Sequence, residues 1–370
     1  MKILYVTTVG GTMSFFVEHF RMLTNEGHTV EVACNLSSPV KNEILEMGIK
    51  SHDICFSRNP FSADNLNAYK DLKKLVIDGE YDIVHCHTPN AAAITRLACN
   101  NLRKKGLRVI YTAHGFHFYK GAPLKNWMIF YPVEWICAHL TDTLITINKE
   151  DYALAKKHMQ AKSIEYIPGV GVDLKKFCTT NKMDENKRLS IGVPENAKMI
   201  LSVGELNENK NHQIVIKALS QISNDDIHYV IAGEGPQKDD LLSLAGKLGI
   251  SSRIHLLGFR DDVAELYSIA DMYALPSIRE GLNVSIMEAM SEELPCIVSR
   301  IRGNMDLIDD NGGALYNPLD CAEVRKSIEK ILSMNSNERE QFGKYNKNKI
   351  FGFGSEVVID KLNKIYEKYI

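Results

Sequence analysis

Two glutamates that flank a short turn are the residues of this sequence best suited to ligand chemistry. Glu280 and Glu288 lie eight residues apart in the stretch SIREGLNVSIMEAM, and a glycine directly follows the first of them. An ionised carboxylate only accepts hydrogen bonds, so it suits the neighbouring hydroxyl groups of a sugar. The alternative interpretation is a loop and a surface helix carrying two solvated acids. The elements that position these side chains decide between the two interpretations.

The residues between the two glutamates predict the start of a helix. The apolar run MYALPS ends just before the turn, and the helix should begin near Val284 with Asn283 as its N-cap. The amides of Leu282, Asn283 and Val284 would then face an anion, and the positive end of the helix favours a diphosphate. Under this interpretation the two glutamates hold one sugar each, on either side of a diphosphate.

Other polar groups follow short apolar runs in the same way. Gly10 and Gly11 follow the first run, where glycines let backbone amides approach a ligand, although a tight turn explains them equally well. His114 precedes Gly115 in TAHGFHF, which leaves its ring room to meet a ligand. Lys210, in SVGELNENKNH, could meet a phosphate as a point charge or lie solvated at a helix start. The G-x-G-x-x-G fingerprint is absent, which argues against NAD.

The elements that would carry these groups are short β-rich runs separated by helical patterns. Such alternation predicts parallel sheets built from βαβ units. The expected strands are 2–8, 29–34, 82–88, 108–114 and 143–148 in the first half and 198–205, 227–235, 253–258, 272–277 and 295–300 in the second. Helical patterns occupy 14–26 and 66–78, among others.

The length of 370 residues exceeds what one hydrophobic core usually holds, so two domains are expected. The polar stretch 168–196, with its glycines and prolines, marks the boundary. The expected fold is α/β, with two Rossmann-like doubly wound domains at 1–170 and 171–354, and a C-terminal helix at 355–370 that packs back on the first. Ligands bind at the carboxyl ends of parallel strands, so two such domains would face each other across a binding cleft.

Composition excludes several classes of protein. A net charge of −2 and a pI of about 6.6 argue against a nucleic-acid partner. The eight cysteines form no C-x-x-C pair, and most lie in apolar runs, as expected for buried thiols in a reducing cytosol. The first apolar run is too short for a signal peptide, and no run reaches about 18 apolar residues, the length of a membrane span. The histidines of HCHTP and TAHGFHF match no common zinc spacing, so no metal is expected.

The motifs, in this order, resemble those of the family 4 glycosyltransferases of the GT-B fold, a group that includes capsule, exopolysaccharide and lipopolysaccharide enzymes. The resemblance covers essentially the whole chain, through the Gly-Gly loop, TAHG, IPGVGVD, SVGELNENKNH, AGEGPQKDDL, LLGFRDDV, ADMYALPSIREGLNVSIMEAM and RGNMDLI. It implies a retaining hexosyltransferase that moves a hexose or N-acetylhexosamine from a nucleotide diphosphate sugar, expected to be a UDP-sugar. The implied acceptor is a lipid-linked saccharide in cell-surface polysaccharide synthesis.

The resemblance also implies roles for matching residues. Glu280 would contact the donor hexose and His114 would lie near the reacting sugar, so both are expected at the catalytic centre. The expected donor-binding residues are Gly11, Lys210, Arg279, Leu282, Asn283, Val284 and Glu288, with the backbone near Phe259 and Arg260 reading the base. Because no D-x-D triplet occurs, the diphosphate would be stabilised by lysine, helix amides and Arg279, without a metal or other cofactor.

Three departures from the family pattern stand out. Glu205 replaces the usual arginine of the VGRL position, which weakens the expected diphosphate clamp, although Arg279 could supply the missing charge. Ser291 and Glu293 replace the usual small residue and glycine of EAMAxGxP. The interdomain IPGVGVD is one residue longer than the usual IPNGVD.

The segment 115–140 is rich in aromatic residues, among them Trp127, and a basic run precedes it. The run comprises Arg103, Lys104, Lys105 and Arg108. Aromatic and cationic side chains together suit a lipid–water interface, although a core-packing helix explains the aromatics equally well. A polyprenyl-diphosphate-linked acceptor, and peripheral contact with the inner face of the plasma membrane, would explain both features.

Three other classes share parts of this pattern. A non-hydrolysing sugar-nucleotide epimerase would convert its substrate without an acceptor. A phosphorylase-like enzyme would carry pyridoxal phosphate and absorb accordingly. A non-catalytic sugar-nucleotide binder would show saturable binding without turnover.

Overall fold

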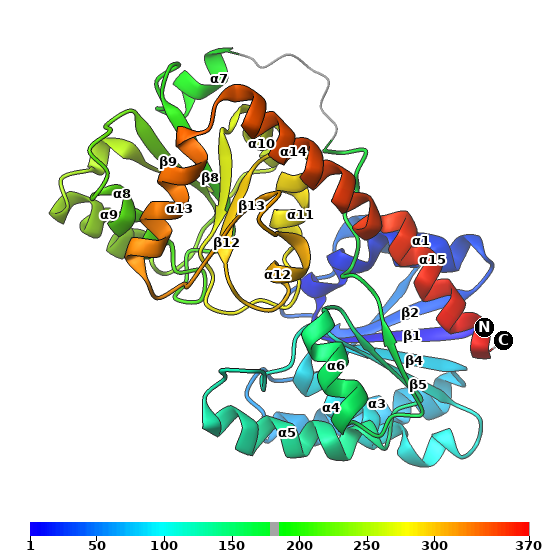
Figure 1. Ribbon diagram of the computed structural model, residues 1–370. Coiled ribbons are helices and arrows are strands. Elements are labelled where there is room, and N and C mark those ends of the chain that lie inside the picture. The colour runs from blue at the N-terminus through cyan, green and yellow to red at the C-terminus, as the bar shows by residue number, and fades with distance from the viewer. Residues whose placement is uncertain (178–184, 370) are drawn as a thin grey trace. The chain divides into compact units, whose positions relative to one another are not determined.

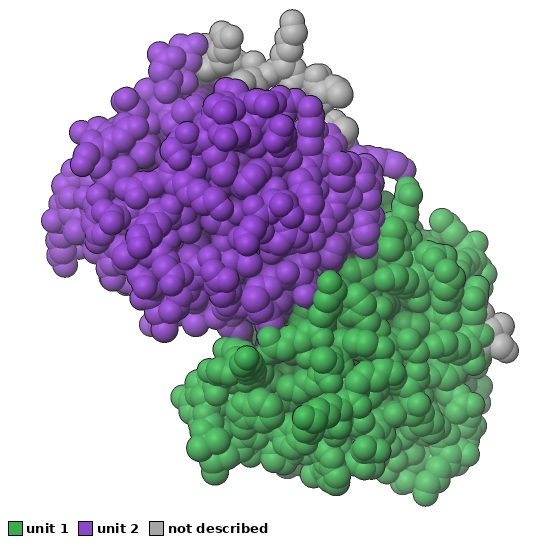
Figure 2. Space-filling view, viewed as in Figure 1, with its two compact units in different colours: residues 1–170, 355–370 green, residues 171–354 purple. Residues whose placement is uncertain are grey.

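The computed structural model describes residues 1–177 and 185–369, which form two compact units. Unit 1 comprises residues 1–170 together with 355–370, and unit 2 comprises residues 171–354 (Figure 2). Each unit contains one parallel β-sheet with helices on both faces, as the sequence predicts for a doubly wound α/β fold.

The sheet of unit 1 has the strand order β3-β2-β1-β4-β5-β6-β7, and all its neighbours pair in parallel. Its strands are β1 (Lys2–Val9), β2 (Thr29–Asn35), β3 (Lys50–Asp53), β4 (Ile83–His87), β5 (Arg108–Ala113), β6 (Thr143–Thr146) and β7 (Ser163–Tyr166). The chain order reverses direction at β1, between β2 and β4, so polar loops at the carboxyl ends of β1 and β4 lie next to one another.

Helices cover both faces of this sheet (Figure 1). One face packs against α3 (Asp64–Gly79), α4 (Pro89–Arg103), α5 (Leu124–Ala138) and α6 (Lys149–His158). The other packs against the 3-10 helix η1 (Gly10–Phe16), α1 (Val17–Asn25), α2 (Asn42–Glu46) and α15 (Ser355–Tyr366), which η4 (Glu367–Tyr369) follows. The helical pattern expected at 14–26 is therefore α-helical only from Val17, because the chain leaves β1 through a tighter 3-10 turn.

The C-terminal helix α15 returns to the sheet of unit 1 and is held there by a buried polar chain. The Tyr366 hydroxyl lies 2.8 Å from the Tyr5 hydroxyl and 2.6 Å from Nδ1 of His85. The other ring nitrogen of His85 lies 2.8 Å from the Thr112 hydroxyl. A buried hydrogen-bonded chain of this kind fixes the position of the helix as well as covering the sheet.

The sheet of unit 2 has the order β10-β9-β8-β11-β12-β13, again entirely parallel. Its strands are β8 (Lys198–Val203), β9 (Ile227–Ala232), β10 (Ile254–Gly258), β11 (Met272–Leu275), β12 (Cys296–Ser299) and β13 (Gly313–Tyr316). Its helices are α7 (Glu185–Ser190), α8 (His212–Leu219), α9 (Lys238–Lys247), η2 (Ser251–Arg253), α10 (Val263–Ile269), α11 (Val284–Ser291), α12 (Asn304–Leu307), α13 (Cys321–Ser333), α14 (Ser336–Ile350) and η3 (Phe351–Phe353).

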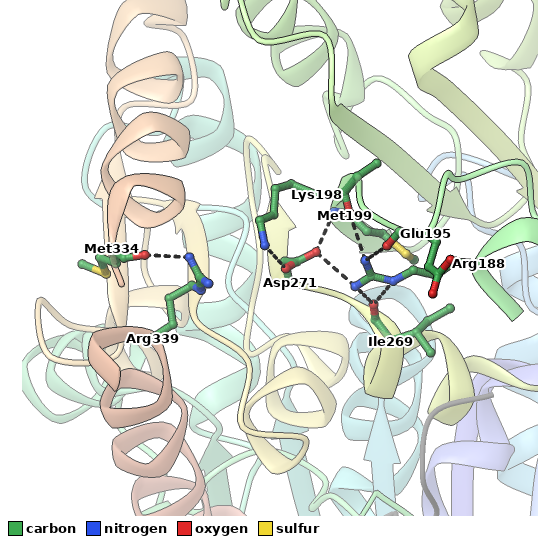
Figure 3. A network of polar contacts seen from close by, with 9 residues as sticks. Arg188, Glu195, Lys198, Met199, Ile269, Asp271, Met334 and Arg339 are labelled. Carbon is green, nitrogen blue, oxygen red and sulfur yellow. Dashed lines mark hydrogen bonds and ion pairs between the residues drawn. The ribbon is translucent and has the colours of Figure 1, made fainter. Parts of the chain in front are cut away.

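A polar network links the amino-terminal ends of β8 and β11 (Figure 3). The Arg188 guanidinium donates to the carbonyl of Ile269 at 2.9 Å and to the carboxylate of Asp271 at 3.1 Å. The same carboxylate accepts hydrogen bonds from Lys198 Nζ at 3.1 Å and from the Met199 amide at 2.9 Å. Charged groups therefore hold the amino-terminal ends of these strands together. The loops described below lie at the carboxyl ends of the strands.

Every strand expected from the sequence is present, and three strands that the sequence did not indicate are β3, β7 and β13. Five cysteines are buried as expected, namely Cys34, Cys86, Cys99, Cys137 and Cys296. Cys55 is exposed and Cys321 is half-buried, so the expectation, which was made for most of the cysteines, agrees with the described ones. Cys178 lies outside the described residues.

Candidate active site

Two loops at the carboxyl edge of the unit 2 sheet are held against each other by asparagine side chains. Nδ2 of Asn209, after β8, donates to the carbonyl of Arg279, after β11, at 2.9 Å. The Asn209 carbonyl accepts from the Ile278 amide at 2.8 Å. Nδ2 of Asn211 donates to the carbonyl of Pro276 at 3.3 Å. These bonds fix the turn that carries Glu280 relative to the segment that carries Lys210.

Lys210 and Glu280 form an ion pair at this junction. Lys210 Nζ lies 2.8 Å from Oε1 of Glu280, and the two side chains are only 16% and 13% exposed. The lysine stem passes over Gly204, where an added Cβ would lie 3.3 Å from Lys210 Cε. The sequence singled out both residues, but only the fold shows that they contact each other.

Helix α11 begins at Val284, and Asn283 is its N-cap, as predicted. The Asn283 side chain accepts from the Ser285 amide at 2.9 Å. Within the described part of the chain, no acceptor takes the amides of Leu282, Asn283 or Val284. The turn before the helix is packed closely, since a Cβ on Gly303 would lie 1.9 Å from the Gly281 carbonyl oxygen. The free amides and the positive helix end can therefore bind an anion beside Glu280 and Lys210.

Glu288 lies one turn inside α11 and is half-buried. Its Oε2 accepts a hydrogen bond from the Tyr267 hydroxyl at 2.9 Å. Burial raises the pKa of Glu288 to about 7, while the Tyr267 bond and nearby Lys176 oppose that rise. This carboxyl therefore changes its charge near neutral pH, unlike an ordinary surface glutamate.

The remaining residues that the sequence assigned to donor binding lie in loops at the same end of the sheet. Arg279 is exposed, and no acid among residues 1–177 and 185–369 pairs with it. Glu205 is exposed after β8. Phe259 is exposed after β10, and its neighbour Arg260 is bound to the carboxylate of Asp262. No hydrogen bond within the described chain uses the amides of Phe259 or Arg260.

In unit 1, His114 lies at the end of β5 within a cluster of histidines. Its Nε2 lies 3.0 Å from Nδ1 of His87, which ends β4. Burial lowers the pKa of His114 to about 4, so its ring is neutral at pH 7. Its Nδ1 has no hydrogen-bond partner among the described residues and remains able to meet a ligand. No group of three or more potential ligands in the described ranges could hold a metal ion.

The Gly10–Gly11 turn has a structural explanation in the loop that follows β2. A Cβ on Gly10 would lie 2.3 Å from the Ser38 carbonyl oxygen, and one on Gly11 would lie 2.8 Å from the Ser38 hydroxyl. The Gly11 amide donates to that hydroxyl at 3.3 Å. Gly10 is therefore required for close packing against backbone, whereas a side chain at Gly11 would displace only the Ser38 hydroxyl.

The basic run and Trp127 differ in part from their expected placement. Arg103 was expected as a surface cation, but its guanidinium binds both carboxylate oxygens of Asp142, at 2.8 and 3.0 Å, and its side chain is 10% exposed. Trp127 packs against the hydrophobic core, and its indole N–H donates to the Tyr119 carbonyl at 3.3 Å. Arg103 is therefore largely engaged within the protein and Trp127 is half-buried, whereas Lys104 and Lys105 are exposed.

Helix α5 lies within the segment 115–140 that the sequence assigned to a lipid–water interface or to the core, and it exposes several large apolar side chains. Its exposed large hydrophobic residues are Leu124, Met128, Ile129, Val133, Trp135 and Ile136. Several large apolar side chains exposed on one helix make α5 a candidate interaction surface. None of the helices in residues 1–177 and 185–369 is long and apolar enough to cross a membrane.

The sequence did not identify several residues of the site, because their side chains bind backbone carbonyls or, for Tyr267, another side chain of the site. Asn209 and Asn211 hold the loops, Tyr267 binds Glu288, and Arg302 donates to the Glu280 carbonyl at 3.2 Å. The asparagines fall within the quoted segment SVGELNENKNH, and Arg302 begins RGNMDLI. Their side-chain type gave no sign of which carbonyl or carboxylate each would meet.

Two family models match the chain. Residues 2–148 match "Glycosyl transferase 4-like" and residues 183–349 match "Glycosyl transferases group 1". The Bacillus subtilis protein named "Putative glycosyltransferase EpsD" is 35% identical over 378 residues, which span 100% of this chain and 97% of EpsD. The UDP-Gal:alpha-D-GlcNAc-diphosphoundecaprenol alpha-1,3-galactosyltransferase of Escherichia coli is 29% identical, covering 97% of this chain and 94% of the relative.

Among solved structures, Anabaena Alr3699/HepE in complex with UDP is similar in fold, with a TM-score of 0.83 and 19% identity over the full length of both chains. Each half of the sequence thus matches a glycosyltransferase model. The fold of the chain is similar over its full length to a solved GT-B structure. The chain belongs to the family 4 glycosyltransferases of the GT-B fold.

Proposed function

We propose that this enzyme transfers a hexose or N-acetylhexosamine, with retention of configuration, from a UDP-sugar to a saccharide carried on polyprenyl diphosphate. The product would serve cell-surface polysaccharide synthesis. The donor class is supported by the HepE structure, which holds UDP, and the acceptor class by the E. coli relative, whose name gives a diphosphoundecaprenol acceptor.

The observation that carries the proposal is the Lys210–Glu280 ion pair beside the N-terminus of α11. A carboxylate suited to sugar hydroxyls and a cation suited to phosphate are thus in direct contact. In the donor complex, the diphosphate takes over Lys210 and the unpaired α11 amides, while a hexose hydroxyl takes over Glu280. The protein charges exchange one partner for another, so neither is left buried and unpaired.

Transfer breaks the bond between the anomeric carbon and the phosphate oxygen, and the electron pair leaves with UDP. The acceptor hydroxyl forms the new bond on the same face of the sugar and gives its proton to a leaving phosphate oxygen. Lys210, Arg279 and the helix amides stabilise the developing diphosphate charge. His114 is neutral, so it can hydrogen-bond the reacting sugar without adding a charge. No metal ion or other cofactor is required in this scheme.

Glu288 would hold the ribose of the nucleotide, and the free backbone near Phe259 and Arg260 would meet the base. On the acceptor side, the exposed apolar face of α5 and the exposed pair Lys104 and Lys105 would contact an anionic membrane surface. Under this proposal the enzyme would lie peripherally on the inner face of the plasma membrane, within reach of a lipid-linked acceptor.

The test is a transfer assay with purified enzyme, a panel of UDP- and GDP-sugars, and a polyprenyl-diphosphate-linked saccharide. Product should form from one donor class, keep the anomeric configuration, and remain unaffected by EDTA. Donor consumption without an acceptor would instead indicate an epimerase, and saturable donor binding without product would indicate a binding protein. Loss of activity with EDTA, restored by manganese, would contradict the metal-free scheme.

A further inference from the structure

Unit 1 contains two adjoining pockets at the carboxyl end of its sheet: an apolar pocket and a second one, called the polar pocket, whose lining includes hydroxyl, amide and guanidinium groups. The first has a volume of about 290 Å³ and lies between α4 and α5, with walls that include Ala93, Leu97, Ile129 and Val133. The second has a volume of about 300 Å³ and is lined by polar groups at the ends of β1 and β4, with Arg58 at its rim. Both volumes are at the lower end of the range for ligand pockets.

The two pockets are adjacent because they share part of their lining. Residues common to both are Pro60, Pro89, Asn90, His117 and Phe130. Asn90 fixes the shared wall, since its Nδ2 donates to the carbonyl of Ser57 at 3.1 Å and to that of Arg58 at 2.7 Å. A ligand with a polar part and an apolar part could therefore occupy both pockets without a break.

The polar pocket suits an anion. Arg58 is exposed, and no acid in the described part of the chain pairs with it. Pro89 and Asn90 also form the first turn of the 15-residue helix α4, whose positive end lies at the same pocket. An arginine fork suits the oxygens of a diphosphate, and here it is aided by the helix end.

The apolar pocket suits a hydrocarbon chain. Its floor is formed by Tyr111 and Glu134, and both polar groups are already satisfied within the protein. The Glu134 carboxylate binds the buried Arg96 at 2.8 and 3.2 Å and accepts from the Tyr111 hydroxyl at 3.2 Å. The pocket therefore offers a ligand little more than apolar surface. Ile129 and Val133 belong to both its wall and the exposed face of α5, so the pocket opens toward that face.

We infer that these pockets bind the lipid carrier of the acceptor, with the diphosphate at Arg58 and the first isoprene units in the slot between α4 and α5. This inference rests on the proposed function for the identity of the acceptor. The saccharide would extend from the diphosphate toward Thr8 and Thr12 at the end of β1, and the rest of the lipid would leave along α5. The lipid tail would thus lie in the apolar pocket, the diphosphate in the polar pocket, and the sugar beyond it at the end of β1.

The direct test is calorimetric binding of farnesyl diphosphate and of inorganic diphosphate to the full-length protein, without any sugar. Farnesyl diphosphate should bind at least about tenfold more tightly, because its chain buries apolar surface. Ala93→Trp, which fills the slot, should remove this difference and leave the binding of inorganic diphosphate unchanged. Arg58→Ala should weaken both ligands. Equal binding of both ligands by the unmodified protein, or an unchanged preference in Ala93→Trp, would overturn the assignment.

A milder pair of variants covers the possibility that Ala93→Trp does not fold. Leu97→Ser replaces a pocket residue that is 48% exposed, and Leu45→Ser replaces a residue on α2 that is 43% exposed and lies outside both pockets. Leu97→Ser should reduce the preference for farnesyl diphosphate several-fold, and Leu45→Ser should keep it. Equal preferences in the two variants would count against the slot.

Transfer assays separate this inference from the proposed function. Ala93→Trp should raise KM for a polyprenyl-linked acceptor and leave KM for a short-chain acceptor unchanged. Sugar transfer with equal KM for long and short acceptors would refute the slot while the function stands. Chain-dependent binding of farnesyl diphosphate without any sugar transfer would refute the function while the slot stands.

Discussion

The two units place their polar groups at the same edge of similar sheets, but the chemistry of the groups differs. In unit 2, the ionised side chains Lys210 and Glu280 contact each other next to free helix amides. In unit 1, the strand ends carry the histidines 85, 87 and 114, and burial lowers the pKa of each. The histidine cluster of unit 1 is therefore neutral at pH 7, whereas the Lys210–Glu280 pair of unit 2 is charged.

The difference follows from what each proposed substrate part requires. A leaving diphosphate needs fixed positive charge and hydrogen-bond donors where its own charge develops. An attacking hydroxyl needs hydrogen bonds and the exclusion of water, and a charged imidazole there would compete for the leaving group. We therefore expect substitutions in unit 1 to leave nucleotide binding intact, and only those in unit 2 to change it.

The largest effect is expected for His114→Ala, which should lower turnover by about 10²–10⁴ if the ring contacts the reacting sugar. Because the pKa of His114 is about 4, the ring is neutral throughout pH 6–9, so the loss should be uniform over that range. The measurement is kcat against pH, with UDP affinity as a second readout that should not change. His158→Ala, at an exposed position on α6, is the matched control and should keep full turnover. A folded His114→Ala enzyme with normal turnover would return this residue to a purely structural role.

Glu280→Ala should lower turnover by about 10²–10³, because it removes the contact to the donor hexose and leaves Lys210 without its partner. Free UDP should bind at least as tightly as before, since Lys210 no longer has a competing carboxylate. Turnover follows from UDP release and affinity from calorimetry. Weaker UDP binding with normal turnover would reverse the two roles. Glu280→Gln keeps the shape and should show whether the charge is required.

Glu288 should make UDP affinity depend on pH. Its pKa is raised to about 7, so the carboxylate that accepts from the ribose hydroxyls is the minor form at pH 6 and the major form at pH 8. The affinity should accordingly rise several-fold between these pH values. Glu288→Gln serves as the control, since it retains only the pH dependence of the UDP phosphate itself. The ribose assignment fails if both proteins show the same change.

The last effect concerns binding to membranes and leaves turnover and nucleotide affinity unchanged. Replacing Lys104 and Lys105 by glutamine should weaken co-sedimentation with anionic vesicles by about thirtyfold at low salt and little at high salt, at about 1 kcal/mol for each lysine. Met128→Ser with Ile136→Ser, on exposed α5 positions, should weaken it at every salt concentration. Leu189→Ser, an equally exposed site in unit 2, is the matched control. Sedimentation that none of these variants changes would remove α5 from the proposed membrane surface.

Much of the candidate site in unit 2 could be predicted from the sequence. The N-cap Asn283, the start of α11 at Val284 and the interior strands follow from local patterns that the structure confirms. The strands that the sequence missed, β3, β7 and β13, all lie at sheet edges and have four residues each. An edge strand has a single neighbour and contributes less to the core, so it lacks the long apolar run that marks an interior strand.

Glu293, which departs from the family pattern, also shows which features can be predicted from the sequence and which cannot. The family pattern has a glycine there, and Glu293 indeed adopts a left-handed φ of 58° directly after α11. The sequence identified the unusual residue, and the fold shows the partner that accompanies it, because Lys347 Nζ lies 2.6 Å from the Glu293 carboxylate. Backbone conformation is thus read from local sequence, and the compensating contact is not.

The sequence by itself determined the α/β class, the order of the interior strands along the chain, and the residue types available at the strand ends, because these depend on local periodicity and capping. Only the tertiary structure decided which of those residues meet. In the structure, Lys210 contacts Glu280, which lies 70 residues away in the sequence. Arg103 binds Asp142, and apolar side chains of α5 are exposed. Contacts between distant segments depend on the packing of the sheets and their loops, and no local pattern of residues encodes that packing.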